Sequence, residues 1–459
     1  MRGSVEQPTV KEISNKKQNN TSFYQTLWRW HLYAGLFFAP FIFILAITGS
    51  MYLFKPQIEQ WMYRDLYVVN DEGSKLPPSL LMEKVSSTYP DSTVVKYRPG
   101  EAATRSAEVK INQNNEVYTV FVDPYSADII GKINDKNRLM DRIEEFHGEL
   151  MLGTTGDRIV ELAACWALIL VFTGLYLWFP RDKNKWRGII IPRFKTNRKT
   201  LLRDLHAVPA FWISAVMVFL IITGLLWSGF WGTRIQTLAT NTGVGYPPSI
   251  WVGSAPSSGL KTKDIADVPW AAENLEVPSS TVKEVQLSID KVVSIASNLE
   301  IYPTYEVIFP KTPEGVFTLS VFPPKARDEA TVHIDQYSGA VLANYRYENY
   351  EPIGKLMAWG ITLHKGLEFG LMNQIIGFVV CIGIAGIVFT GFVMWWKRKP
   401  NGKMGAPRSV SPGKIKGLLV VLAVFGILFP LVGVSLIVVG VIDFFIIKRV
   451  PALKKFFNA

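Results

Sequence analysis

The chain has 459 residues, 49% of them hydrophobic, and its 49 Lys and Arg exceed its 38 Asp and Glu to give a formal net charge of +11. This composition is too apolar for a disordered chain. The positive charge is concentrated in two short segments, 181–206 and 397–416, rather than spread along the sequence. That distribution argues against a nucleic-acid partner and for contact with membrane lipid.

The apolar residues gather into segments long enough to cross a bilayer, which takes about 20 residues. The first one follows a polar tail without an apolar core or a cleavage site, so we expect it to remain as an anchor. In chain order, the predicted segments are the tail 1–31, TM1 32–54, an outer segment 55–146, TM2 147–180, a basic loop 181–206, TM3 207–231, an outer segment 232–363, TM4 364–396 and a basic loop 397–416.

The last apolar segment, 417–447, is too long for a single crossing. As one helix it would measure about 46 Å, whereas the hydrocarbon core is about 30 Å thick. Pro430 interrupts it, and basic residues lie on both sides. We therefore expect an apolar hairpin or re-entrant segment that returns to the cytoplasm, followed by a cytoplasmic tail at 448–459.

The basic loops predict the orientation, because short loops rich in Lys and Arg stay in the cytoplasm. The N-terminus is then cytoplasmic and both outer segments are periplasmic. Each outer segment opens with a helical pattern, at 79–89 and 288–298, and continues with short alternating runs typical of strands. The predicted fold class is an α-helical integral membrane protein with four main transmembrane helices and two α+β outer domains.

The two halves of the chain resemble each other. "VFTGLYLWFPR" at 171–181 aligns with "VFTGFVMWWKR" at 388–398, and "TVFVDPYSADIIGKI" at 119–133 aligns with "TVHIDQYSGAVLANY" at 331–345. This pattern predicts a two-fold internal repeat, with a pseudo-two-fold axis along the membrane normal.

Four histidines occupy matching places in the two halves, each at a fixed distance from a Thr-Gly pair. The spacings are 18 residues from His31 to Gly49 and from His206 to Gly224, and 27 residues from His147 to Gly174 and from His364 to Gly391. The predicted topology places His31 and His206 at the cytoplasmic face, and His147 and His364 at the periplasmic face.

A single imidazole at a membrane interface is most often an amphipathic residue among the headgroups. Two imidazoles at equal depth on facing helices, however, can ligate one haem iron from both sides. Because the chain has no CxxCH motif, the spacing predicts two non-covalent b-type haems. One is held by His31 and His206, and the other by His147 and His364.

The other candidate residues have plain alternatives. The four glycines allow either close approach of a haem or simply tight helix contacts. Arg29, Arg158 and Arg203 are candidates for haem propionate contacts, although anchoring to headgroups is the favoured alternative. A zinc site is an alternative to haem. It needs three or four converging ligands, which histidine pairs at opposite faces do not supply.

Three further expectations concern positions near these sites. On straight helices His147 and His364 would lie about 18 Å outside the bilayer core, which would raise the outer haem to the headgroups. His333 aligns with Phe121 and is expected to be a sheet residue without a ligand role. Asp157 and Glu161 lie where lipid would be unfavourable, so they are expected to face protein or the haem edge.

The ordered set of motifs resembles the PepSY-associated transmembrane family, often described as iron-regulated membrane proteins. The matching motifs, from Trp28 towards the tail, are "WRWHLYAGL" at 28–36, "HGELMLG" at 147–153, "RDLHAVPAFW" at 203–212 and "LHKGLEFG" at 363–370. "FVDPYSADIIG" and "HIDQYSGAVL" look like the PepSY turn-and-strand signature, which makes the two outer domains PepSY-like.

The resemblance implies a multi-pass protein of the bacterial inner membrane that takes part in iron uptake. It also implies that the chain is similar to ferric-siderophore reductases. Ferric iron or a ferric siderophore would then be the electron acceptor at the periplasmic side. The chain has no GxGxxG motif in a strand–helix context, so a quinol or a separate cytoplasmic reductase is the expected donor. Two alternatives remain: a non-enzymatic accessory protein for metal or siderophore transport, and a membrane-anchored PepSY interaction or inhibitor module.

Overall fold

The computed structural model describes residues 10–71, 73–179, 188–245, 257–407 and 416–458. The chain forms two compact units, each assembled from separate stretches of sequence. The helical unit consists of Met1–Ser50, His147–Trp231 and Phe378–Ala459, and the sheet unit consists of Met51–Phe146 and Gly232–Gly377.

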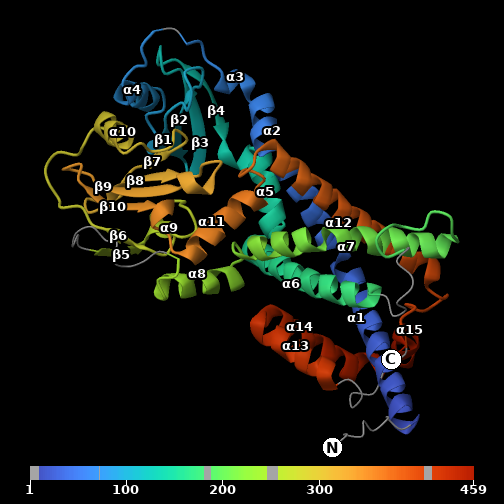
Figure 1. Ribbon diagram of the computed structural model, residues 1–459. Coiled ribbons are helices and arrows are strands. Elements are labelled where there is room, and N and C mark those ends of the chain that lie inside the picture. The colour runs from blue at the N-terminus through green and yellow to red at the C-terminus, as the bar shows by residue number, and fades with distance from the viewer. Residues whose placement is uncertain (1–9, 72, 180–187, 246–256, 408–415, 459) are drawn as a thin grey trace, which may run out of the picture. The chain divides into compact units, whose positions relative to one another are not determined.

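Five helical segments among the described residues are long and apolar enough to span a membrane. Four of them correspond to the predicted spans and lie in α1 (Val10–Tyr52), α6 (Gly153–Trp178), α7 (Arg198–Leu225) and α12 (Leu371–Arg398). The fifth, Pro430–Ile447, lies in the C-terminal apolar segment. Figure 1 shows α6 and α7 as neighbours, and the two helices contact each other.

Large apolar side chains on these helices point outward, as they do where lipid replaces water. Phe37, Phe172 and Phe389 are all at least half exposed. The helical unit also has an apolar interior. Within it, Phe38 and Trp166 stack with ring centroids 5.6 Å apart. An apolar exterior of this extent is typical of a membrane protein.

The predicted spans that begin at His147 and His364 are wrong at their outer ends, because each histidine lies on a separate helix. α5 (Leu139–Glu149) carries His147 and ends at a break where Leu150 and Met151 have positive φ angles of 51° and 60°. The turn is tight: a Cβ on Gly156 would overlap the carbonyl oxygen of Glu149.

His364 is the last residue of α11 (Pro352–His364), and glycines with positive φ separate this helix from α12. Gly366 has φ of 74° and Gly370 has φ of 57°, conformations that glycine adopts without steric cost. Since neither histidine continues a span, the predicted distance of about 18 Å for straight helices does not apply.

The C-terminal apolar segment folds back on itself. α13 (Lys416–Leu428) and α14 (Pro430–Ile442) meet at Phe429 and contact each other. Their backbones approach so closely that a Cβ on Gly426 would lie 3.1 Å from the Cα of Gly433. The hairpin shape agrees with the prediction, and Trp166 of α6 donates a hydrogen bond to Ser435 of α14 at 3.1 Å.

The sheet unit is built on one eight-stranded antiparallel sheet with the strand order β10-β9-β8-β7-β1-β2-β3-β4. The strands are β1 (Thr93–Arg98), β2 (Ala107–Gln113), β3 (Glu116–Val122), β4 (Ile129–Asn134), β7 (Glu306–Ile308), β8 (Val316–Val321), β9 (Ala330–Asp335) and β10 (Val341–Arg346). Each repeat contributes four consecutive strands, and the repeats join where Tyr97 of β1 pairs with Val307 of β7.

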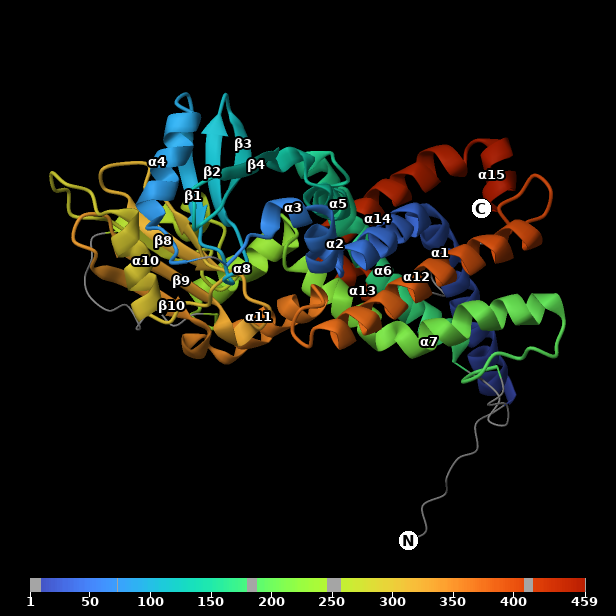
Figure 2. The same cartoon turned by 90° about the horizontal axis from the view of Figure 1, so that it is seen from above.

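This arrangement corrects the prediction of two separate outer domains. The two similar halves of the sequence each supply four strands, and these strands share one sheet and one apolar core. α4 (Pro78–Thr88) and α10 (Ile289–Asn298), one from each copy, cover the same face (Figure 2). Val85 and Val292 are their fully buried contacts with that core.

Smaller elements complete the chain. They are α2 (Lys55–Met62), α3 (Arg64–Tyr67), α8 (Trp231–Asn241), α9 (Thr262–Ile265), α15 (Pro451–Phe457) and a two-stranded sheet of β5 (Ser257–Lys261) and β6 (Glu276–Pro278).

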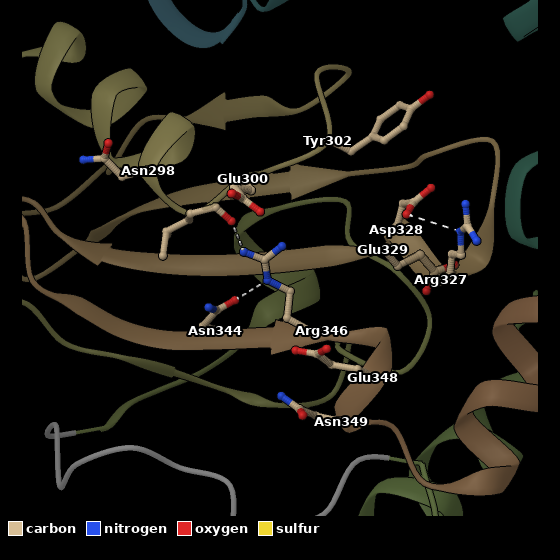
Figure 3. Close-up of a pocket in the computed structure, with 11 residues that line it drawn as sticks. Asn298, Glu300, Tyr302, Arg327, Asp328, Glu329, Asn344, Arg346, Glu348 and Asn349 are labelled. Atoms are coloured by element: carbon tan, nitrogen blue, oxygen red, sulfur yellow. Dashed lines mark hydrogen bonds and ion pairs between the residues drawn. The ribbon is translucent and has the colours of Figure 1, made fainter.

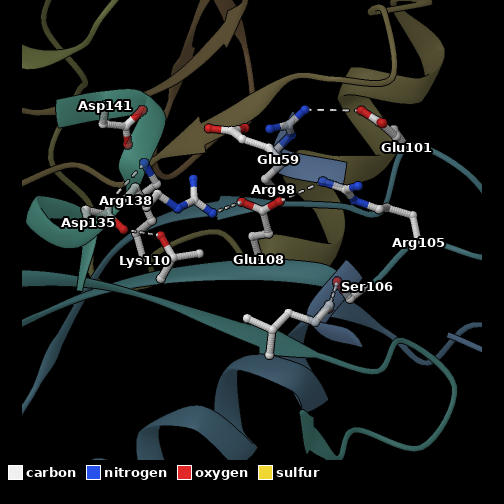
Figure 4. Close-up of polar contacts among 12 residues, drawn as sticks. Glu59, Arg98, Glu101, Arg105, Ser106, Glu108, Lys110, Asp135, Arg138 and Asp141 are labelled. Carbon is white, nitrogen blue, oxygen red and sulfur yellow. Dashed lines mark hydrogen bonds and ion pairs between the residues drawn. The ribbon is translucent and has the colours of Figure 1, made fainter. Parts of the chain in front are cut away.

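The opposite face of the sheet carries a buried layer of charges (Figure 4). Glu108 of β2 lies between two guanidinium groups, 3.5 Å from Arg105 and 4.0 Å from Arg138, and its side chain is only 6% exposed. Lys110 forms a neighbouring ion pair with Asp135 at 3.3 Å. The strand alternation predicts this polar face, whereas its burial depends on elements distant in sequence.

Candidate histidine cluster in the helical unit

His31 of α1 lies against the Thr-Gly pair of α6. A Cβ on Gly174 would come within 3.2 Å of the imidazole Cε1. The Nδ1 atom of His31 is 2.9 Å from the hydroxyl oxygen of Thr173. The missing side chain at Gly174 therefore lets the ring reach the threonine beside it.

His147 of α5 makes the same contact with the Thr-Gly pair of α1. Its Cε1 atom would lie 3.3 Å from a Cβ on Gly49, and its Nδ1 atom is 2.8 Å from the hydroxyl oxygen of Thr48. The tight turn after α5 brings the ring to this place, which a continuous span would not do.

His206 of α7 repeats the contact in the second half of the chain. A Cβ on Gly391 of α12 would lie 3.1 Å from its Cε1 atom. Here Nδ1 donates to the carbonyl oxygen of Ile387 at 2.9 Å, and the hydroxyl of Thr390 lies farther away at 3.4 Å.

The geometry explains the spacings of 18 and 27 residues in the sequence. His31 contacts Gly174 and His147 contacts Gly49. Within the first repeat, each histidine therefore contacts the glycine that lies at the fixed spacing from the other histidine. The glycines were predicted to allow a haem to approach, and the close approach described at Gly49, Gly174 and Gly391 is made by imidazole rings. The sequence singled out the Thr-Gly pairs, but it did not indicate that the threonines contact the imidazoles.

His31 and His206 occupy corresponding places in the two repeats and lie near each other. A charge on one imidazole would repel a charge on the other across the helices. Both rings have Nδ1 engaged in a hydrogen bond, which leaves Nε2 as the available nitrogen. His364 ends α11 in the sheet unit, and Gly224 lies in the last turn of α7.

Two of the candidate arginines bind protein groups near the ends of helices. Arg29 donates from Nη1 to the carbonyl oxygens of Pro407 at 2.8 Å and Asn458 at 3.0 Å. Arg203 pairs with the buried Asp204 at 2.9 Å. Their contact with haem propionates stays a prediction.

Arg158 belongs to a carboxylate cluster at the start of α6. It pairs with Asp157 at 3.1 Å and with Glu161 at 3.4 Å. Glu161 also accepts hydrogen bonds from the backbone N–H groups of Phe230 and Trp231, at 3.0 and 3.1 Å. The two carboxylates therefore face protein, as expected, and hold the turn that follows α7.

His333 is a buried residue of β9, as its alignment with Phe121 predicts. Its Nδ1 atom is 3.0 Å from the hydroxyl of Thr318, and its Nε2 atom is 3.4 Å from the hydroxyl of Thr262. Burial lowers its pKa to about 3. Both of its ring nitrogens are therefore engaged with threonines.

The sheet unit also contains a pocket of about 540 Å³ that no sequence motif marks. Figure 3 shows it beside β10, where Arg346 donates to Asn344 and to the carbonyl oxygen of Leu299, both at 2.8 Å. Glu329 is one of its lining residues, and burial raises the pKa of this carboxyl to about 8. The lining carries both signs of charge and does not by itself specify a ligand.

Comparison with known families and proteins gives one match. The family model of the PepSY-associated TM region matches residues 28–398, and no curated protein matches the chain. The match covers most of the chain. It includes the whole of the spans in α6, α7 and α12 and nearly all of the span in α1. It agrees with the resemblance drawn from the sequence motifs and with the five apolar helices. The chain is therefore a multi-pass membrane protein that belongs to the PepSY-associated TM region family.

Proposed function

We propose that this protein carries electrons across the bacterial inner membrane through two non-covalent b-type haems and reduces ferric iron or a ferric siderophore at the periplasmic side. The observation that carries the proposal is the His31–His206 pair. Two imidazoles from corresponding places in the repeats lie near each other, each with Nδ1 bonded and Nε2 available.

These residues fit a haem. Axial haem ligation needs a neutral imidazole nitrogen, and metal-binding histidines almost always bond through their other nitrogen to a protein acceptor. Thr173 and the carbonyl of Ile387 fill that acceptor role for His31 and His206. When bound, the haem would supply reversible one-electron chemistry.

The chain's own part is to hold and orient the ligands. Gly174 and Gly391 give the rings room, and the hydrogen bonds to Nδ1 hold each ring in place. If His31 and His206 both held one haem iron, the iron would have no open position, which would suit electron transfer rather than binding of oxygen. The sequence repeat predicts a second pair, His147 with His364, for the other haem.

The direction of transfer rests on the predicted topology. The basic loops place His31 and His206 at the cytoplasmic side, where a quinol or a cytoplasmic reductase would donate electrons. The acceptor would be met at the periplasmic side by the PepSY-like sheet unit. Reduction of ferric iron weakens its binding to hard oxygen ligands, so it would release iron from a siderophore.

The test is a reduced-minus-oxidised absorption spectrum of the purified full-length protein, with haem quantified per chain. We expect a Soret band and two haems in the wild type. The control is His333→Phe, which places in the second repeat the residue type that the first repeat has at Phe121, and it should leave both haems. A haem-supplied preparation without a Soret band would contradict the proposal and favour a transport accessory or an interaction module.

A further inference from the structure

We infer that Thr173 and Thr48 are positioning residues that set which nitrogen of His31 and His147 carries the proton. In this arrangement each imidazole is neutral, and its protonated Nδ1 donates to the threonine. At His31, Nε2 then keeps its lone pair for a metal. The role in metal binding rests on the proposed function. The assignment of the proton does not, because it follows from hydrogen bonds within the protein.

The hydrogens available at Thr173 determine which atom donates in its contact with His31. A threonine hydroxyl has one hydrogen to donate and two lone pairs that accept. The Thr173 hydroxyl donates to the carbonyl oxygen of Ile169 in the preceding turn at 2.8 Å. Its only hydrogen is then in use, so its 2.9 Å contact with Nδ1 of His31 requires that Nδ1 be the donor.

Thr48 gives the same result for His147. Its hydroxyl donates to the carbonyl oxygen of Ile44 at 2.8 Å, and its oxygen lies 2.8 Å from Nδ1 of His147. The helix therefore supplies the carbonyl that orients the hydroxyl, and the hydroxyl orients the imidazole. A valine at either position would keep the shape of the side chain and remove the acceptor.

His206 reaches the same state by a different route. Its Nδ1 atom faces the carbonyl oxygen of Ile387 at 2.9 Å, and a carbonyl can only accept. Thr390 lies at 3.4 Å and donates its own hydrogen to the carbonyl of Gly386 at 2.8 Å. The threonine is therefore secondary at this position, and Thr390→Val should matter less than Thr173→Val.

His333 of the sheet unit shows that a proton on Nδ1 is not the rule for every histidine of this chain. Thr262 donates its hydroxyl hydrogen to the carbonyl of Leu275 at 3.0 Å, so its 3.4 Å contact makes Nε2 of His333 the donor. Nδ1 then accepts from the hydroxyl of Thr318 at 3.0 Å. This arrangement predicts the opposite proton position at His333, which makes it an internal reference.

The inference has a measurable consequence for a bound haem. A hydrogen bond from Nδ1–H makes the imidazole a stronger donor through Nε2, and removing such a partner typically lowers metal affinity by about 10–100-fold. The donor strength matters most for ferric iron, so Thr173→Val should raise the reduction potential. A tenfold loss confined to the ferric state corresponds to about 59 mV for a one-electron couple.

The test uses the haem-free, full-length protein in lipid nanodiscs at neutral pH, with isotope-labelled histidine ring nitrogens read by NMR. Signals are assigned by their loss in single histidine variants. We expect a proton on Nδ1 of His31, His147 and His206 and on Nε2 of His333. Thr173→Val should change the His31 signal and Thr173→Ser should retain it. Thr237→Val, which removes a hydroxyl bonded within α8 at 2.8 Å, should change none.

A proton on Nε2 of His31 or His147 in the wild type would overturn the inference. So would a Thr173→Val variant whose His31 signal matches the wild type. Redox titration of the haem-loaded protein is the second measurement, in which Thr173→Val should shift the potential upward and Thr173→Ser should restore it. Identical potentials in all three proteins would also overturn the inference. Because NMR needs no haem, failure here is distinguishable from a protein that binds no haem.

Discussion

His31 and His206 of the helical unit differ from His333 of the sheet unit in how they use their ring nitrogens. In the helical unit, His31 and His206 each bond through Nδ1 and have Nε2 available. In the sheet unit, His333 uses both nitrogens, and Glu108 and Lys110 of the polar layer form ion pairs with Arg138 and Asp135. A buried polar group that is fully paired stabilises the fold, whereas one with a nitrogen to spare is available for a ligand.

The largest expected effect tests the paired state of the sheet unit. Glu108→Ala would leave Arg138 buried without its carboxylate, and breaking a buried ion pair in this way costs about 3–5 kcal/mol. We expect a large drop in the melting temperature of the sheet unit, which scanning calorimetry would measure. The matched control is Glu101→Ala, which removes a more exposed pair with Arg98 and should cost about 0–1 kcal/mol. Equal effects of the two substitutions would show that the charged layer is not a stabilising network.

A second effect in the sheet unit depends on pH. Burial raises the pKa of Glu329 to about 8 from its usual 4.5. Between these values the unfolded chain has lost the proton and the folded chain retains it, so stability falls as pH rises from 4.5 towards 8. Glu329→Gln should flatten that slope in melting curves recorded across the range, while Glu348→Gln, at an exposed position beside the same pocket, should not. An unchanged slope in Glu329→Gln would contradict this account of the carboxyl.

The smallest effect tests the room that the helical unit leaves for its rings. An alanine Cβ at Gly391 would lie 3.1 Å from the His206 ring, so the ring must shift by a few tenths of an ångström. We expect Gly391→Ala to weaken haem binding severalfold, as judged by haem retained on dilution. Gly386→Ala is the control, because no atom lies within 4 Å of a Cβ at that position on the same helix. Equal haem retention by both variants would mean that the glycine contact is dispensable.

Much of the fold follows from the sequence because it depends on local pattern. The four spans are recognisable from apolar length, and the interruption at Pro430 predicts the turn between α13 and α14. The repeat shows that the strand segments are copies, but not that they join, since the pairing of Tyr97 with Val307 links residues far apart in the chain. Two separate domains and one shared sheet have the same local pattern.

The candidate site was predictable in its residues and not in its contacts. Equal spacings singled out the histidines and glycines, yet the assignment of His31 to Gly174 and His147 to Gly49 depends on the break after α5. That break has positive φ angles at Leu150 and Met151, which are not glycines, and only Gly153 at its end is a residue type that favours such an angle. The role of the threonines required hydrogen-bond partners that only the folded chain reveals.

The central claim is that His31 and His206 hold the same haem, and a double-variant count of haem per chain tests it most directly. The account predicts two haems in the wild type, one in His31→Ala, one in His206→Ala and still one in the double variant, because both substitutions empty a single site. A double variant that loses both haems while each single variant loses one would contradict the account, since the two histidines would then belong to different sites.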